Sequence, residues 1–463
     1  MRAFMKRSIL LMQEHASGGA FRTEPLGYLF ASRRPSAATA FEAEARACHG
    51  DDVRVFSSAA SVTAAGRARF GARTALATGA DVYSGEAAVI AGFPYLSSDV
   101  MGLMHTRNCG WLVSAHTMGM DMLDSLLARR GADGASLTTL IHGAVVGADL
   151  GPSGARVKAI KVRQTAANSP PLELSCGSFI NATGPFLRST HADILGARDT
   201  TGAAARANGL PTVSEVHAKV IFRDVLGLIP RDAPQVILTD AIAPVWLPGE
   251  LDFLAETEGA ATAARAGAIM SGGAHFRPYG GEKSNAVLML WESWHHGVEA
   301  GHGDDAPPES ANRFLETKLY PDICLRGLAR VIPALAAYFD EDARGRLSES
   351  RGGSELPHPV EPITDGGYYT KTKENHPLVG PAPGPAGEGK LDGAFLCGAV
   401  SGYGIMASHA AGELAAAHAV GGALPTHMLS YADLLNPLRY QDKEFVRPGG
   451  VRDQLLAAGG GQL

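Results

Sequence analysis

Apolar and small residues recur at helical spacing in several stretches of the chain. Glycines follow three of these stretches, and glycine readily ends a helix. Pro321 and Pro333 are expected to break another one. Residues 37–91 are rich in Ala, Gly and Arg but have no clear period, which predicts helix plus loops. Helices are therefore expected at residues 1–15, 121–130, 315–338 and 405–420.

Shorter apolar stretches bounded by turn residues predict strands. Three strands between residues 143 and 174 are expected to form a small antiparallel unit. Gly280 and Gly281 predict a hairpin, and the acidic, proline-containing stretch 301–310 predicts an exposed loop. Because strands and helices mix at irregular spacing, we expect an α/β domain and a β-rich domain that are interleaved in sequence. The expected strands cover residues 27–31, 143–146, 157–162, 172–174, 178–181, 218–223, 235–239, 275–278, 287–291, 368–372 and 394–400.

Composition removes several classes of function. The 463 residues suffice for two or three domains, and a net charge of −6 argues against electrostatic binding of nucleic acid. No apolar run reaches the roughly 18 residues that a membrane span needs. The five cysteines are scattered and never spaced C-x-x-C, which argues against a disulfide framework or a zinc site. We expect an intracellular, cytoplasmic protein, with mitochondrial and peroxisomal locations left open.

A metal site is not expected either. The adjacent His295 and His296 are the most suggestive pair, but neighbouring side chains in a strand point to opposite faces. No further ligand accompanies them at a useful spacing.

A strand, a glycine-rich turn and a helix are predicted in succession over residues 394–420. Gly398, Gly402 and Gly404 would let the backbone approach a ligand closely. The helix N-terminus would offer free N–H donors and a positive dipole end to a polar or anionic group. A second turn of similar form ends the strand at Asn181. Taken alone, each turn is explained more simply as a tight connection without a ligand.

Three motifs taken together resemble one protein family. Asn181–Pro185 reads N-A-T-G-P and resembles an N-A-A-G-P signature, Glu374–Pro381 resembles D-x-x-P-L-I-G-P, and Gly398–Met406 resembles G-x-S-G-x-G-x-x. In this order they are similar to motifs of the D-amino-acid oxidase, glycine oxidase and sarcosine oxidase superfamily of flavoproteins. The resemblance is strong over residues 360–445, moderate over 85–300 and faint before that.

The resemblance implies a two-domain α/β flavoprotein. Such a protein has a Rossmann-like FAD-binding domain and a substrate domain built on a mixed β-sheet. The implied FAD-binding domain covers residues 1–20, 115–205 and 373–445, the substrate domain covers 21–114 and 206–372, and 446–463 form a tail.

The resemblance also places the cofactor. The turn after Asn181 would pass close to the diphosphate and ribityl part of FAD, and the turn at Ser401–Met406 would lie at the pyrimidine edge of the flavin ring. Gly366 and Gly367 stand where some relatives tether FAD to a cysteine, so we expect non-covalent FAD. The implied cofactor-binding residues are Ala182, Thr183, Gly184, Pro185, Gly398, Ser401, Gly402, Tyr403, Gly404, Ile405 and Met406.

The reaction implied is oxidation of an amino acid or a secondary amine by hydride transfer to flavin N5, with dioxygen or another electron acceptor. A cation would bind a substrate carboxylate. Lys371 is the first candidate and Arg277 the second, with Tyr369 and Tyr368 beside them. Plain ion pairs and ordinary strand aromatics are the alternatives. No lysine occurs on the strand 287–291, where some amine-oxidising relatives carry one, so fast reaction with oxygen is open.

The start of the chain departs from the family. Relatives begin with a strand, a G-x-G-x-x-G turn and a helix, whereas no such turn precedes Gly184 here. Ser17–Gly19 is the nearest candidate, but it follows a predicted helix. We interpret the sequence as starting after roughly the first βαβ unit. Two alternatives therefore stay open beside the amine oxidoreductase: a 2-hydroxy-acid dehydrogenase of the same superfamily, and a non-catalytic or truncated flavoprotein-like scaffold or assembly factor.

Overall fold

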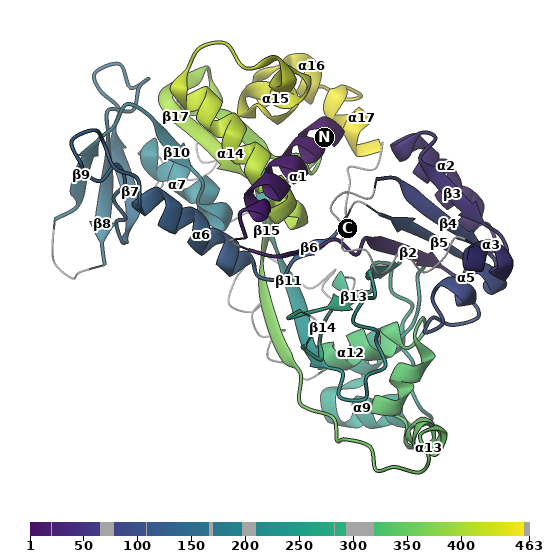
Figure 1. Cartoon of the computed structure of the whole chain (residues 1–463). Coiled ribbons are helices and arrows are strands. Elements are labelled where there is room, and N and C mark those ends of the chain that lie inside the picture. Colours follow the sequence, from purple (N-terminus) through teal and green to yellow (C-terminus); the bar gives the residue numbers. More distant parts are fainter. Residues whose placement is uncertain are drawn as a thin grey trace.

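A nine-stranded mixed sheet is the largest element of the computed structural model, which describes residues 1–19, 21–64, 78–107, 109–165, 170–196, 210–281, 283–292 and 319–457. Its strand order is β15-β11-β14-β13-β12-β2-β5-β4-β3, in which only β12–β2 and β3–β4 pair in parallel. Figure 1 shows the two long strands β11 and β15 side by side. The strands are β2 (Tyr28–Ser32), β3 (Val53–Phe56), β4 (Ala80–Ser84), β5 (Gly102–Thr106), β11 (Thr212–Arg223), β12 (Gln235–Leu238), β13 (His275–Pro278), β14 (Ala286–Leu290) and β15 (Ile363–Thr372).

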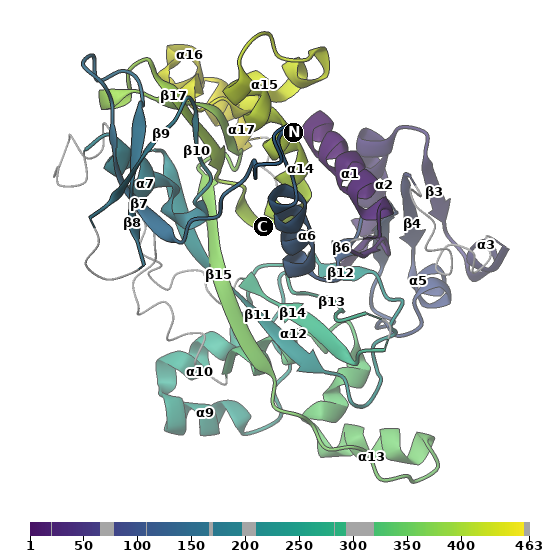
Figure 2. The ribbon, with the colours of Figure 1, turned by 60° about the vertical axis from the view of Figure 1, so that its left-hand side comes forward.

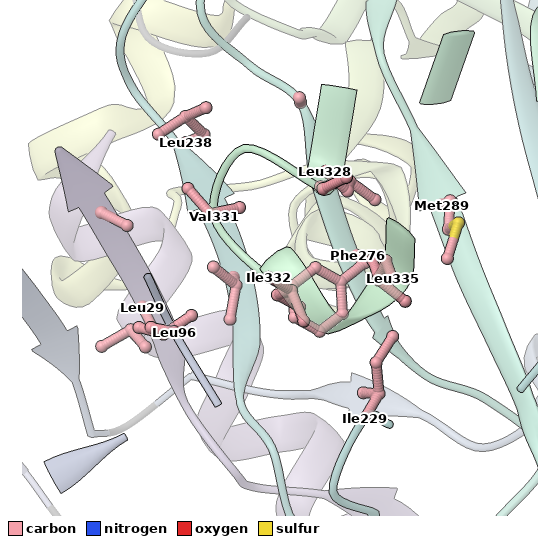
Figure 3. Close-up of a cluster of buried hydrophobic side chains, with 14 of the residues drawn as sticks. Leu29, Leu96, Ile229, Leu238, Phe276, Met289, Leu328, Val331, Ile332 and Leu335 are labelled. Carbon is pink, nitrogen blue, oxygen red and sulfur yellow. The ribbon is translucent and has the colours of Figure 1, made fainter. Parts of the chain in front are cut away.

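One face of this sheet packs on the main hydrophobic core. Phe276 and Met289 project from β13 and β14 toward Leu328 and Leu335, which belong to α12 and to the short 3₁₀ helix that follows it. Figure 3 shows these side chains gathered on the same side of the strands. Because successive residues of a strand point to opposite faces, the residues between these core positions face the other way. That second face carries the polar groups described below.

A smaller sheet lies on the opposite side of the molecule, with strand order β10-β17-β16 and a parallel β10–β17 pair. Helices α1 and α14 pack against each other beside it, as both ribbon views show. Phe4, Leu414 and Tyr431 are buried between them, and Arg7 forms an ion pair with Glu413. The elements are α1 (Arg2–Ser17), β10 (Phe179–Asn181), β16 (Leu378–Pro383), β17 (Lys390–Gly398) and α14 (Gly404–Val420).

A third sheet of three antiparallel strands, β7 (Gly143–Asp149), β8 (Ala159–Gln164) and β9 (Leu172–Ser175), packs beside α7, and β1 (Thr23–Glu24) pairs with β6 (Trp111–Leu112). The remaining α-helices are α2 (Ala37–His49), α3 (Ala59–Ala64), α5 (Glu86–Gly92), α6 (Ala115–Leu127), α7 (Leu187–Ile194), α9 (Glu250–Glu258), α10 (Ala260–Gly267), α12 (Leu319–Leu328), α13 (Glu341–Ser350), α15 (Leu429–Leu435), α16 (Lys443–Val446) and α17 (Val451–Ala457).

The mixed α/β fold, the antiparallel unit and the hairpin are confirmed. The prediction for residues 37–91 is wrong in part, because this stretch also contains strands β3 and β4. The helix expected at 121–130 begins earlier, at Ala115, where the Ser114 side chain accepts a hydrogen bond from the Thr117 N–H. Pro321 lies in the first turn of α12, directly after residues outside the described part, and the break expected near Pro333 is confirmed because α12 ends at Leu328 and a 3₁₀ helix starts at Pro333. The expected loop at 301–310 lies outside the described residues, and the domain boundaries stay a prediction.

One buried histidine makes stability depend on pH. Burial lowers the pKa of His191 to about 4, and the side chain has only 1% of its surface exposed. The unfolded chain therefore binds this proton more tightly than the folded one, so stability is lost as the pH falls from about 6.5 toward 4. Between pH 7 and pH 5, the free energy of unfolding of the wild type should fall by about 2 kcal/mol more than that of a His191→Gln variant.

Urea unfolding of both proteins at the two pH values measures this difference. His358→Gln, at an exposed position, is the matched control and should keep the wild-type pH dependence. Equal pH dependence of the His191→Gln variant and the wild type would contradict the prediction.

Candidate functional site

Ion pairs run along the polar face of the large sheet. Lys371 on β15 and Glu215 on β11 lie 2.6 Å apart between Nζ and Oε2. The same Oε2 is 3.7 Å from Nε2 of His217, and Nδ1 of His217 is 2.7 Å from Oε1 of Glu292, which follows β14. When His217 is protonated, two cations alternate with two carboxylates. The charge of Lys371 is therefore already balanced by Glu215.

The pKa shifts of Glu215 and His217 favour the charged forms of both groups. The interaction with His217 is the main cause that lowers the pKa of Glu215 to about 2, against the opposing effect of burial, and Lys371 adds to it. Burial acts to lower the pKa of His217, but Glu215 and Glu292 together outweigh it and raise that pKa. With a carboxylate near each ring nitrogen, the imidazolium form of His217 is favoured.

Tyr369 links this row to the glycine-rich turn. Its ring stacks on His217 with centroids 3.7 Å apart and an interplanar angle of 18°. A Cβ atom at Gly402 would lie 2.6 Å from the Tyr369 ring, so only glycine allows the turn to come this close to β15. Tyr368, the neighbouring residue on the strand, points to the opposite face. The structure thus brings Tyr369 and the predicted cofactor turn together.

The turn between β17 and α14 is open at its tip. Ala399 and Ser401 have positive φ angles of 55° and 49°, a strained conformation for residues other than glycine that recurs at functional sites. No side chain caps the start of α14 at Gly404, which leaves backbone N–H donors for another acceptor. Gly402 and Ile405 are exposed beside these donors. These features suit a planar, polar ligand edge.

Three other predicted residues of this turn have packing roles. A Cβ atom at Gly398 would lie 3.1 Å from Leu187, so the glycine allows β17 to approach α7 closely. Tyr403 is buried, and its hydroxyl donates a hydrogen bond to the carbonyl of Asn375. Met406 is half-buried and packs on the core between α1 and α14.

The predicted turn after Asn181 lies at the same sheet edge as the turn after β17. Asn181 at the end of β10 pairs with Leu396 of β17, so the two turns leave neighbouring parallel strands at their carboxyl ends. The Asn181 amide donates to the Leu187 carbonyl at 2.9 Å, and its Oδ1 accepts from the Thr183 hydroxyl at 2.7 Å. Ala182 and Thr183 are exposed, Gly184 has a positive φ of 59°, and Pro185 lies within the short 3₁₀ helix Gly184–Phe186. Such an edge is where α/β sheets bind ligands.

Arg277 also projects from the polar face of the large sheet, and no described carboxylate balances its positive charge. It lies on β13, half-buried, with its guanidinium 5.2 Å from the ring of Trp111 and 5.5 Å from that of Tyr279. Burial lowers its pKa to about 10. Within the described part of the chain no carboxylate forms an ion pair with it. Arg277 is therefore better placed than Lys371 to bind an anion from outside.

The residues present fit the ring end of a flavin. The uncapped N-terminus of α14, the exposed Gly402 and the adjacent Tyr369 supply donors and an aromatic surface at one place. Ala182 and Thr183 are exposed at the neighbouring turn. No three His, Cys, Asp or Glu side chains of the described residues could hold a metal ion, and His295 and His296 lie outside that part.

Comparison with solved structures places the fold. The chain resembles L-proline dehydrogenase from P. horikoshii (15% identity, TM-score 0.54, covering 95% of this chain and 83% of that one). It also resembles glycine oxidase from Geobacillus kaustophilus (12% identity, TM-score 0.51, covering 92% of this chain and 80% of that one). A third similar structure is iminodiacetate oxidase from Chelativorans sp. BNC1 (13% identity, TM-score 0.52, covering 93% of this chain and 82% of that one). The chain thus has the two-domain fold of amino-acid and amine oxidoreductases, and the resemblance seen in the motifs is confirmed at the level of the fold.

Sequence comparison adds no closer relative. No family model matches the chain, and no curated protein is significantly similar to it. None of the helices in the described ranges combines the length and apolar character needed to cross a bilayer.

Sequence reasoning missed three members of the site, Glu215, His217 and Glu292. The strand was predicted to start at residue 218, whereas β11 starts at Thr212. The alternation of polar residues at positions 215, 217 and 219 was the available signal, because period-two polarity marks one face of a strand. Glu292 directly follows a predicted strand and had no such signal.

Proposed function

We propose that the chain is an FAD-dependent oxidoreductase that oxidises an amino acid or a secondary amine, with FAD bound non-covalently. The observation that supports it most is the contact between Tyr369 and Gly402, which joins the polar sheet face to the uncapped turn. The similar solved structures act on proline, glycine and iminodiacetate according to their names. All three compounds have a carboxylate and an amine, which agrees with the unbalanced charge of Arg277.

Each group on the face has a part in this proposal. Bound FAD would supply the two-electron acceptor. The two turns at the carboxyl ends of β10 and β17 would hold it, with the α14 N-terminus next to its ring. Arg277 would bind the substrate carboxylate, and Tyr369, held by His217, would form a wall beside the reacting carbon. Lys371 would keep Glu215 charged rather than contact the substrate. The proposed division into FAD-binding and substrate domains follows the ranges given above, and the proposed location is the cytoplasm.

An absorbance spectrum of the purified chain, recorded with and without added FAD, tests the proposal. We expect flavin bands near about 370 and 450 nm that remain after gel filtration. Denaturation should release all the flavin into the supernatant, which separates non-covalent from covalent binding. Failure to retain FAD even when it is in excess would contradict the proposal and favour the non-catalytic scaffold.

The substrate class is then tested anaerobically. We would add one compound at a time to the FAD-loaded protein: glycine, L-proline, iminodiacetate or L-lactate. Flavin reduction is followed as bleaching of the absorbance band near about 450 nm. Reduction by an amine but not by lactate supports the proposal. Reduction by lactate alone would favour the 2-hydroxy-acid dehydrogenase. Reoxidation with air and with an artificial dye distinguishes an oxidase from a dehydrogenase.

A further inference from the structure

His275 is held in one tautomer by its backbone contact. Its Nδ1 lies 2.7 Å from the carbonyl oxygen of Gly273. A carbonyl oxygen only accepts hydrogen bonds, so Nδ1 must carry the proton. In the neutral ring Nε2 then has the free lone pair. No described residue donates a hydrogen bond to this nitrogen, so it is available as a proton acceptor.

The strand places His275 and Arg277 on the same face of the sheet. His275 and Arg277 are two residues apart on β13, so both project from the polar face at a spacing of about 6.6 Å between their Cα atoms. The carboxylate and the amine of an α-amino acid sit on adjacent atoms. A substrate whose carboxylate binds Arg277 can therefore present its nitrogen to His275.

The other titratable groups on this face are unsuited to take up a proton. His217 has carboxylates near both ring nitrogens, which favour its protonated form, and its pKa is raised. Glu292 is paired with His217. Burial raises the pKa of Tyr28 to about 12 and that of Cys109 to about 11, so both stay protonated. Among the described residues, His275 is the neutral base that remains.

We propose that His275 accepts a proton from the ammonium group of an amino-acid substrate whose carboxylate is bound by Arg277. This inference rests on the proposed function and names its substrate class. The N–H bond of the ammonium breaks, and its electron pair stays on nitrogen as the lone pair that assists oxidation of the adjacent carbon. The proton forms a bond to Nε2, which leaves an imidazolium with both ring nitrogens protonated. The proton returns to solvent after turnover.

The surroundings keep His275 neutral before substrate arrives. Burial is the main cause that lowers its pKa, and Arg277 and His217 act in the same direction, whereas the Gly273 carbonyl and Glu292 oppose them. The base form therefore predominates at neutral pH. Glu292 then offers a nearby negative charge to the imidazolium that forms.

The test compares the FAD-loaded wild type with His275→Gln, which can still donate to Gly273 but cannot take up the proton. We expect kcat/KM for the amino acid that reduces the wild type to fall about 100-fold or more at pH 7. The loss should shrink as the pH approaches the pKa of the substrate's own ammonium group, because the amine then arrives neutral. His358→Gln should behave as the wild type.

A second measurement needs no turnover. ¹⁵N chemical shifts of histidine-labelled wild type at pH 7 should show one resonance with protonated Nδ1 and unprotonated Nε2 that is absent from His275→Gln. A protonated Nε2 at pH 7, or a His275→Gln pH profile equal to that of the wild type, would overturn the inference while leaving the oxidoreductase intact. A wild type that oxidises a secondary amine but no amino acid would overturn the inference alone, and one that oxidises neither would overturn both.

Discussion

An Arg277→Met variant should require about 100-fold more amino acid for half-maximal flavin reduction than the wild type. Its guanidinium is half-buried against Trp111 and Tyr279, and no described carboxylate balances it. A substrate carboxylate would supply the missing partner through a charge-assisted hydrogen bond. Removing one side of such a pair costs about 2–5 kcal/mol, which corresponds to the expected loss of affinity.

The comparison of two substrates makes this prediction specific. Relative to the wild type, the variant should need a higher concentration of an amino acid for half-maximal flavin reduction. The concentration needed of the corresponding amine without a carboxylate should be unchanged. Lys219→Met is the matched control, because Lys219 lies on strand β11 of the same sheet and is paired with Asp365 at 2.8 Å. An equal loss for both substrates would mean that Arg277 acts on the fold rather than on the carboxylate.

Replacing Arg439 with methionine should lower the free energy of unfolding by about 3–5 kcal/mol. Arg439 Nη2 lies 2.8 Å from Oε1 of Glu374, and the side chains are 4% and 0% exposed. Arg439 also donates to the carbonyls of Pro377 and His376, at 3.0 and 3.1 Å. The variant leaves the Glu374 carboxyl buried without its cation, and two carbonyls lose their donor.

Urea unfolding at pH 7 measures this loss. Arg447→Met removes an exposed ion pair with Glu444 and should change stability by less than about 1 kcal/mol. The double variant Glu374→Gln/Arg439→Met should be more stable than the sum of the two single losses predicts, because no unpaired charge then stays buried. Strictly additive losses would contradict the proposed coupling.

The two turns were predictable because their chemistry is local. Strand, glycines and helix follow one another between residues 394 and 420, and the structure has β17, the turn and α14 there. The choice between Lys371 and Arg277 was not predictable. The partner of Lys371 is Glu215, which is distant in sequence and becomes adjacent only through the β11–β15 register.

Strands β3 and β4 show a second limit. Each is short, and β4 is buried at four of its five positions, so neither has the alternating pattern by which a half-buried strand is identified. Arg54 of β3 and Ala80 of β4 are also residue types that occur readily in helices. Pairing of β3 with β4 and of β4 with β5, together with cover by α2, decides their structure, and all of these are tertiary contacts.

The packing of α1 on α14 has a consequence for how the chain folds. Arg7 and Glu413 form their ion pair across 406 residues of sequence. Closing so long a loop is slow, and proteins rich in such distant contacts fold slowly. During synthesis from the N-terminus, α1 emerges long before α14 exists, so the apolar face around Phe4 has no partner until the ribosome has passed residue 415. The small sheet and the two turns that we propose to bind the cofactor must therefore be completed late, after the large sheet has had its strands available for pairing.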